Sequence, residues 1–375
     1  MTYASGPLWM VAELTYACPL QCVYCSNPVN FAQSAGQELT TEQWLDVLLQ
    51  ARQLGVVQVG FTGGEPLIRK DLESIIKKSR DLGFYSNLIT SALGLTEGRL
   101  QKLVKAGLDH VQISFEAGTR KLHDELSVVS CFEHKIAMAK AVKKEGISLV
   151  LNFVIHRENI HEINDMLTLA ISLGADSVEL ANCQYYGWAN LNREYLLPSS
   201  AQLQKAEADV HAFRQSHKEL EIYYVVPDYY EGRPKACSAG WGNIAMVVSP
   251  EGNVLPCHGA HHIEKFIKPN IRSHTLEWIY RESDIFNVFR GDKWMKSPCA
   301  DCEERHLDFG GCRCQAYILT GDAANCDPVC TKSPDHRIVE KIIEKLGSTA
   351  DNLVHNKQPY LRNKKNSKRL QSGRL

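Results

Sequence analysis

Short apolar segments alternate with amphipathic segments along the first two thirds of the chain. The apolar segments are continuous, as in parallel strands buried on both faces: 10–17, 56–62, 84–92, 110–117, 149–155 and 177–183. The segments between them have helical periodicity and end at a glycine: 40–55, 71–83, 95–107, 132–146 and 159–174. The pattern predicts six βα units in an α/β fold, arranged as an open doubly wound sheet or a partial barrel.

The rhythm changes after about residue 221. Residues 222–230 and 245–257 are predicted to form strands, the second region as a hairpin around a Pro-Glu-Gly-Asn turn, and residues 336–347 a helix. Residues 357–375 contain seven lysines or arginines and no acid, which predicts a solvated, flexible tail. We therefore expect a core domain over 1–220, a second domain over 221–345 and a basic tail over 346–375.

Composition is that of an ordinary globular protein. The 375 residues are 44% hydrophobic and 23% charged, and the formal net charge of -1 gives no bias toward nucleic acid or membrane. The N-terminus lacks the pattern of a signal peptide, and no apolar run is long enough to suggest a membrane span. We expect a cytoplasmic protein with neither nucleic acid nor membrane as partner.

The 13 cysteines are clustered. Three lie near the N-terminus, eight lie between Cys237 and Cys330, and only Cys131 and Cys183 stand alone. An odd number of cysteines in a reducing compartment argues against structural disulfides and favours metal or cluster ligands. Cys131 and Cys183 are expected to be small buried apolar residues.

Cys18, Cys22 and Cys25 follow the first predicted strand with the spacing C-x3-C-x2-C. A zinc site would need a fourth ligand from elsewhere, usually from a second C-x2-C pair. Three thiolates in one loop can instead hold three corners of a [4Fe–4S] cluster, which leaves one iron open.

This loop, with Tyr24 before its last cysteine, resembles the signature of radical S-adenosylmethionine (SAM) enzymes. The resemblance implies that the open iron binds the amino and carboxylate groups of SAM, and that electron transfer from the cluster yields a 5′-deoxyadenosyl radical. Thr62 to Pro66 match the GGEP turn of that family, which makes Gly63, Gly64 and Glu65 expected cofactor contacts, together with Tyr24 of the cysteine loop. Ser114 and Asn152 match positions that contact the ribose or carboxylate, although polar capping of strand ends would also explain them.

The C-terminal cysteines resemble the SPASM extension of peptide-modifying radical enzymes, which holds two auxiliary iron–sulfur clusters. Asp308 stands where the extension has a cysteine, and the conserved spacing favours its use as a ligand. The resemblance implies two ligand sets, with Cys314, which lies outside the general extension pattern, as the fourth member of the first, and no place for Cys326. The expected ligands are Cys237, Cys257, Cys312 and Cys314 for the first cluster, and Cys299, Cys302, Asp308 and Cys330 for the second.

A narrower resemblance is to the PqqE family, the PqqA peptide cyclases of pyrroloquinoline quinone (PQQ) biosynthesis. It rests on four stretches and extends to about residue 334: QYYGWA (184–189), GRPKACSAGWG (232–242), DFGGCRCQA (308–316) and LTGDAANCDPVC (319–330). It implies an oxidoreductase that joins a glutamate and a tyrosine of the precursor peptide PqqA by a carbon–carbon bond. The implied partners are PqqA, the peptide chaperone PqqD and an electron donor of flavodoxin or ferredoxin type.

The expected architecture is thus a partial (β/α)6 TIM-type barrel with a C-terminal SPASM domain. Two alternatives stay open: another SPASM-type peptide maturase that makes a thioether or other crosslink, and a zinc-stabilised peptide-binding module without redox chemistry. The sequence names no catalytic base, because nothing distinguishes Glu13, Asp124, His156 and His258. Tyr185, Tyr186 and Trp188 could line a substrate channel or pack a domain junction.

Overall fold

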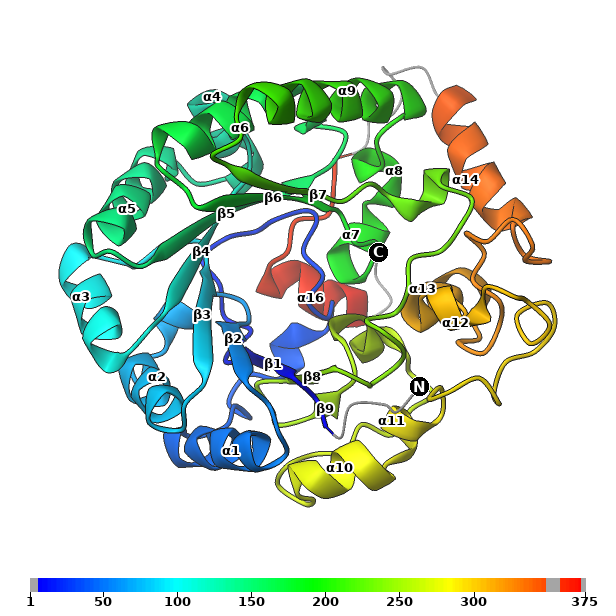
Figure 1. Ribbon diagram of the computed structural model, residues 1–375, viewed down its shortest axis with the longest axis horizontal. Coiled ribbons are helices and arrows are strands. Elements are labelled where there is room, and N and C mark those ends of the chain that lie inside the picture. The colour runs from blue at the N-terminus through cyan, green and yellow to red at the C-terminus, as the bar shows by residue number, and fades with distance from the viewer. Residues whose placement is uncertain (1–5, 349–357, 372–375) are drawn as a thin grey trace.

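The computed structural model describes residues 6–348 and 358–371, which form one curved sheet with helices around it (Figure 1). The strand order is β7-β6-β5-β4-β3-β2-β1-β8-β9, and every pairing is parallel except that of β8 with β9. The strands are β1 Trp9–Glu13, β2 Gln58–Thr62, β3 Tyr85–Thr90, β4 His110–Phe115, β5 Ser148–Ile155, β6 Ser177–Asn182, β7 Glu221–Tyr224, β8 Ala245–Val248 and β9 Val254–Leu255.

Helices cover the outer face of the sheet, as right-handed crossovers require. Their inward faces carry the apolar residues of the helical pattern, such as Trp44 and Leu48 on α1, which are fully buried. These helices are α1 Thr41–Gln53, α2 Leu72–Asp81, α3 Glu97–Ala106, α4 Arg120–Ser127, α5 Phe132–Lys144, α6 Ile163–Ser172 and α9 Ser200–Ser216. The short helices α7 Gly187–Leu191 and α8 Arg193–Leu196 follow β6 and lie inside this ring (Figure 1). The predicted βα units are therefore confirmed.

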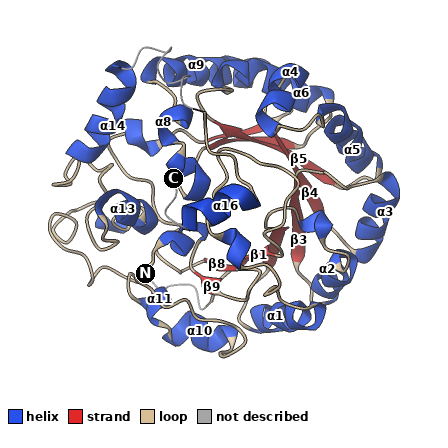
Figure 2. Ribbon diagram, turned by 180° about the vertical axis from the view of Figure 1, so that it is seen from behind, coloured by secondary structure: helices blue, strands red, loops and turns tan. Residues whose placement is uncertain are grey.

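The C-terminal region closes the open side of the curved sheet (Figure 2). The predicted hairpin is confirmed as β8 and β9, and β8 also pairs in parallel with β1, which the sequence did not predict. The sheet thus continues past the expected boundary at residue 220. The helices of this region are α10 Leu276–Glu282, α11 Asp284–Asn287, α12 Arg305–Asp308, α13 Arg313–Thr320 and α14 Arg337–Ser348.

The prediction of a solvated, flexible tail is wrong for residues 358–371. These residues return to the barrel and include helix α16 Lys364–Gln371, which lies at the centre of the ring of helices in both ribbon views. Arg362 and Ser367 are buried, with 3% and 0% of their surface exposed. The basic composition of this segment predicted that it would be solvated. Two of its side chains, those of Arg362 and Ser367, are nevertheless buried. Residues 349–357 and 372–375 lie outside the described residues.

Candidate active site

The three cysteines of the C-x3-C-x2-C loop line one cavity of about 450 Å³ at the carboxyl ends of the strands. Burial raises the pKa of Cys18 to about 12 and holds that of Cys22 well above its usual range, so a bound cation is needed to stabilise thiolates here. No further cysteine lines the cavity among the described residues. The donor set therefore fits an iron–sulfur cluster that keeps one iron open to the cavity.

The glycines of the TGGEP turn let it pack directly on the backbone of the cysteine loop. A β-carbon at Gly63 or Gly64 would lie 2.2 Å from a carbonyl oxygen of that loop, and Gly63 has a φ of +137°. The Gly64 N–H donates to the Thr15 carbonyl oxygen at 2.6 Å, and the Glu65 N–H donates to that of Ala17 at 2.8 Å. Both glycines line the cavity, so the turn and the loop form one wall.

Glu65, expected among the cofactor contacts, supports this wall from behind. It is fully buried, and its carboxylate accepts hydrogen bonds from the Thr90 hydroxyl and the backbone N–H groups of Leu67 and Ser91. Burial raises its pKa, while these hydrogen bonds oppose the shift. It does not lie among the described residues that line the cavity.

The inner faces of β4, β5 and β6 supply the polar wall opposite. Ser114 and Asn152 are register partners on β4 and β5, and both line the cavity, as expected for cofactor contacts. The amide of Asn152 donates to the Glu179 carboxylate at 2.8 Å, which orients the amide oxygen. Which group of the cofactor each residue contacts stays a prediction.

Glu116 lines the cavity and was missed by the sequence analysis. It directly follows β4, is 1% exposed, and accepts a short hydrogen bond from the Tyr24 hydroxyl. Its other oxygen lies 3.8 Å from the Cys22 sulfur. Glu116 therefore fixes the orientation of Tyr24 and of the loop that holds the cysteines.

A buried carboxylate with two histidines lies beside the loop. Glu13, 1% exposed, contacts Nδ1 of His258 at 2.7 Å and Nε2 of His261 at 3.1 Å, and accepts from the Tyr16 hydroxyl at 3.0 Å. Burial alone would raise the pKa of Glu13, but the histidines hold it well below its usual range. Of the four candidate bases, His258 is the one among the described residues that lines the cavity. His156 is fully buried beside the Tyr24 ring.

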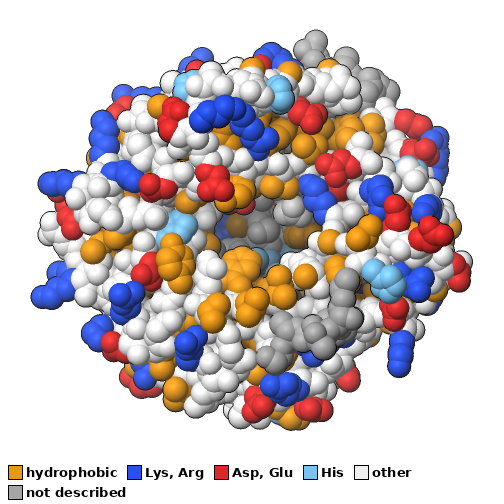
Figure 3. Space-filling view, in the orientation of Figure 1, with side chains coloured by type: hydrophobic (Ala, Val, Ile, Leu, Met, Phe, Trp, Pro, Cys, Tyr) orange, Lys and Arg blue, Asp and Glu red, His pale blue; other side chains and the backbone are white. Residues whose placement is uncertain are grey.

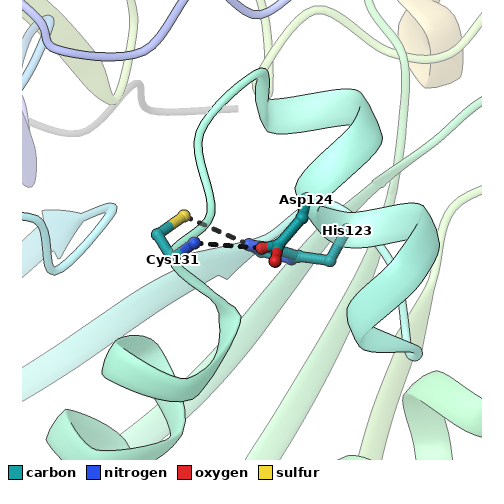
Figure 4. A group of neighbouring side chains, drawn as sticks. All are labelled: His123, Asp124 and Cys131. Atoms are coloured by element: carbon teal, nitrogen blue, oxygen red, sulfur yellow. Dashed lines mark hydrogen bonds between the residues drawn. The ribbon is translucent and has the colours of Figure 1, made fainter.

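His123, Asp124 and Cys131 form a compact group with metal-ligand chemistry (Figure 4). Asp124 accepts from the backbone N–H groups of Cys131 and Phe132 and so stabilises the start of α5. Nδ1 of His123 accepts from the Glu116 N–H at 3.1 Å, which leaves Nε2 to carry the proton toward Cys131. These contacts explain the group as a structural cap. Cys131 is 3% exposed and Cys183 fully buried, as expected.

Arg362 is the least predictable residue of the site. It belongs to the C-terminal segment, yet it lines the same cavity as the cysteine loop. The guanidinium donates to the Tyr16 carbonyl oxygen and lies 4.2 Å above the Phe31 ring.

The C-terminal region brings together the first expected set of auxiliary ligands. The sulfurs of Cys257 and Cys314 lie 3.4 Å apart. Burial and the neighbouring thiols of Cys257 and Cys312 hold the pKa of Cys237 well above its usual range. The grouping fits a cluster held by these four thiols. The Tyr186 hydroxyl contacts the Cys312 sulfur at 3.0 Å, which links the set to the barrel.

The second set includes a residue that the sequence left unassigned. The hydrogen bond with Cys326 lowers the pKa of Cys299, while the neighbouring charges of Asp308 and Cys330 oppose this shift. The Cys302 sulfur lies 3.4 Å from the ammonium of Lys332. Cys326 hydrogen-bonds with the thiol of Cys299 and so lies within this group. The set offers four thiols and one carboxylate, and ligation by Asp308 stays a prediction.

The aromatic run after β6 mostly packs the junction between the barrel and the C-terminal region. Tyr185, 6% exposed, lies against Tyr229 with ring centroids 5.5 Å apart, and Trp188 is fully buried against Phe31. Tyr186 stacks on His262. Gln184, just before the run, lines the cavity.

Comparisons with known proteins agree with this arrangement. Residues 12–170 match the family model of the radical SAM superfamily, and residues 237–303 match that of an iron-sulfur cluster-binding domain, SPASM. The chain contains a radical SAM domain followed by a SPASM domain, and it is an enzyme of the radical SAM superfamily. Its cofactors are accordingly a [4Fe–4S] cluster, SAM and auxiliary iron–sulfur clusters.

Solved structures share the fold. Streptococcus suis SuiB bound to SAM has a TM-score of 0.71 at 20% identity over 87% of this chain and 77% of SuiB. The structure of SuiB bound to its precursor peptide SuiA has a TM-score of 0.70 at 20% identity, over 88% of this chain and 76% of SuiB. The protein anSMEcpe with bound AdoMet has a TM-score of 0.62 at 15% identity, over 94% of this chain and 100% of anSMEcpe.

Within the described ranges, no helix combines the length and apolar character needed to cross a bilayer.

Proposed function

We propose that the protein is a peptide-modifying radical SAM enzyme that forms a carbon–carbon bond between a glutamate and a tyrosine of PqqA, an early step of PQQ biosynthesis. The fold is shared with SuiB, whose structure was determined with a precursor peptide. The sequence stretches shared with the PqqE family, including Asp308, support the narrower assignment.

A cluster held by Cys18, Cys22 and Cys25, together with SAM, would supply a 5′-deoxyadenosyl radical able to remove one hydrogen atom from the glutamate side chain. The carbon radical then adds to the tyrosine ring, and the ring must lose one electron and one proton to become aromatic again. The peptide loses two hydrogens in total. The chain has to orient both side chains, exclude water and accept the electron close to the ring.

One observation carries the proposal: a residue that lines the SAM cavity directly follows a member of the first set of auxiliary ligands. His258 lines the cavity. The sulfur of the preceding residue, Cys257, lies 3.4 Å from the sulfur of Cys314. An auxiliary cluster held by Cys257 would be one residue along the chain from the lining of the cavity and could accept the electron from the ring. This adjacency favours an oxidative crosslink, which needs such an acceptor.

Anaerobic incubation with reductant, SAM, PqqA and PqqD tests the proposal. We expect PqqA to lose two hydrogens in mass, with tandem fragmentation that places the crosslink between glutamate and tyrosine. PqqA with phenylalanine in place of the tyrosine should give no such crosslink at the original position if the hydroxyl activates the ring. SAM cleavage with unchanged PqqA would favour another SPASM-type maturase instead. Zinc without iron or sulfide would favour the binding module.

A further inference from the structure

The C-terminal segment 358–371 is attached to the cysteine loop and its neighbours by specific hydrogen bonds. The Asn363 amide donates to the Gln21 side-chain oxygen at 2.9 Å, and the Ala32 N–H donates to the Ser367 hydroxyl at 3.3 Å. The Asn192 amide and the Tyr360 backbone exchange two hydrogen bonds of 2.8 and 2.9 Å. Four separate bonds hold the segment in one position, so Arg362 enters the cavity on a fixed backbone.

Arg362 is a buried cation with an unused donor. Only 3% of its surface is exposed, and its Nε has no hydrogen-bond partner among the described residues. Burying a cation without an anionic partner costs free energy, which an anion bound in the cavity would recover. The remaining contacts, with the Tyr16 carbonyl and the Phe31 ring, fix the plane of the guanidinium.

The charge of the cavity indicates what that acceptor is. Arg362 is the one arginine or lysine among the described residues that line the cavity. Cys18, Cys22 and Cys25 line the same cavity, so the guanidinium faces the same space as the cluster ligands. The missing ligand group is therefore an anion or a strong acceptor close to the cluster.

We propose that Arg362 binds the carboxylate of the methionine part of SAM, so that the C-terminal segment is part of the cofactor site. SAM carries an ammonium and a sulfonium group, which repel arginine, and a single carboxylate, which accepts two parallel hydrogen bonds from a guanidinium. The inference rests on SAM as the cofactor and is independent of which peptide is modified.

Equilibrium binding of two ligands to the anaerobically prepared, cluster-loaded enzyme tests the proposal. The ligands are SAM and decarboxylated SAM, which lacks only the carboxylate. Arg362→Gln should weaken SAM binding by about tenfold or more, since hydrogen bonds to charged groups have that magnitude. Binding of decarboxylated SAM should change less than about twofold. Iron and sulfide content, measured in parallel, should equal that of the wild type.

Two controls separate a ligand contact from a structural role. Lys365→Gln removes one charge from an exposed position of the same segment and should leave both affinities unchanged. Arg362→Lys keeps the charge but loses the planar fork, and should again weaken SAM more than decarboxylated SAM. It also replaces Arg362→Gln if that variant fails to retain its cluster.

Equal loss of both ligands, or unchanged SAM binding, would overturn the proposal. In the first case Arg362 only holds the segment in place; in the second the carboxylate is bound by another group. Failure of PqqA to react would leave these binding measurements intact, so the proposed function and this inference are tested separately.

Discussion

Gly64→Ala should separate the TGGEP turn from the cysteine loop. A β-carbon at residue 64 would lie 2.2 Å from the carbonyl oxygen of Ala17 and 2.8 Å from that of Tyr16. Both obstacles are backbone atoms, so no side-chain rotation can relieve the overlap. The turn must move by roughly 1 Å, as overpacked sites do. That movement stretches the hydrogen bonds from Gly64 to Thr15 and from Glu65 to Ala17.

The expected cost follows from these contacts. Two weakened backbone hydrogen bonds contribute about 1 kcal/mol each, and overpacking adds about 1–3 kcal/mol, for a total of about 3–5 kcal/mol. For a chain of this size, the melting temperature should fall by roughly 4–6 °C. Affinity for SAM should also fall, because Gly63 and Gly64 form a wall of the cavity.

Differential scanning fluorimetry and SAM binding under anaerobic conditions measure both effects. Gly98→Ala is the matched control, because no heavy atom lies within 4 Å of its added β-carbon and the residue lies in α3. Alanine in a helix is favoured over glycine by about 0.5–1 kcal/mol, so this control should be neutral or slightly stabilised. A Gly64→Ala protein that matches wild type in both measurements would refute the steric argument.

Three further predictions follow from the site. Cys22→Ala should abolish reductive cleavage of SAM, measured as 5′-deoxyadenosine by chromatography; retained cleavage would contradict the ligand assignment. Asp308→Ala should change the paramagnetic resonance spectrum of one auxiliary cluster and spare that of the N-terminal cluster; identical spectra would mean that Asp308 is no ligand. Asp124→Ala should lower stability by about 1 kcal/mol through loss of the α5 cap. Burial raises the pKa of Asp124, but its hydrogen bonds outweigh burial and lower it. The contribution is therefore complete above the usual carboxyl pKa and is lost as pH falls through the folded value. Denaturant titrations of wild type and variant at neutral and acidic pH should thus converge, and a constant difference would contradict this.

The residues that the sequence predicted and those that it missed differ in kind. Strand and helix patterns are local, and the cysteine loop and the TGGEP turn each lie within one short stretch, so the fold and the principal wall of the site were predictable. Glu116 follows a predicted strand, and its position after β4 was the available signal. Arg362 carried no such signal, because its position depends on where a distant segment packs.

The edge pairing of β8 was also beyond local patterns. A hairpin pattern predicts that β8 and β9 pair with each other, but it does not state which sheet edge they join. Likewise, the basic composition around Arg362 predicted a solvated tail, although four hydrogen bonds hold the segment against the barrel.

Figure 3 shows a central hollow on one face, bordered by hydrophobic side chains, with charged side chains mostly further out.

The parallel pairing of β1 with β8 has a consequence for electron transfer. β1 leads into the loop with Cys18, and β8 leads through β9 to Cys257, while Trp9 pairs with Ala245 and Ala12 with Val248. A slip of one residue would shift one strand by about 3.3 Å and reverse its side chains, which the buried faces forbid. The spacing between the N-terminal cysteine loop and Cys257 is therefore set by backbone hydrogen bonds inside one sheet. If the two groups of cysteines hold the proposed clusters, surface substitutions in either domain should leave the distance for electron transfer unchanged.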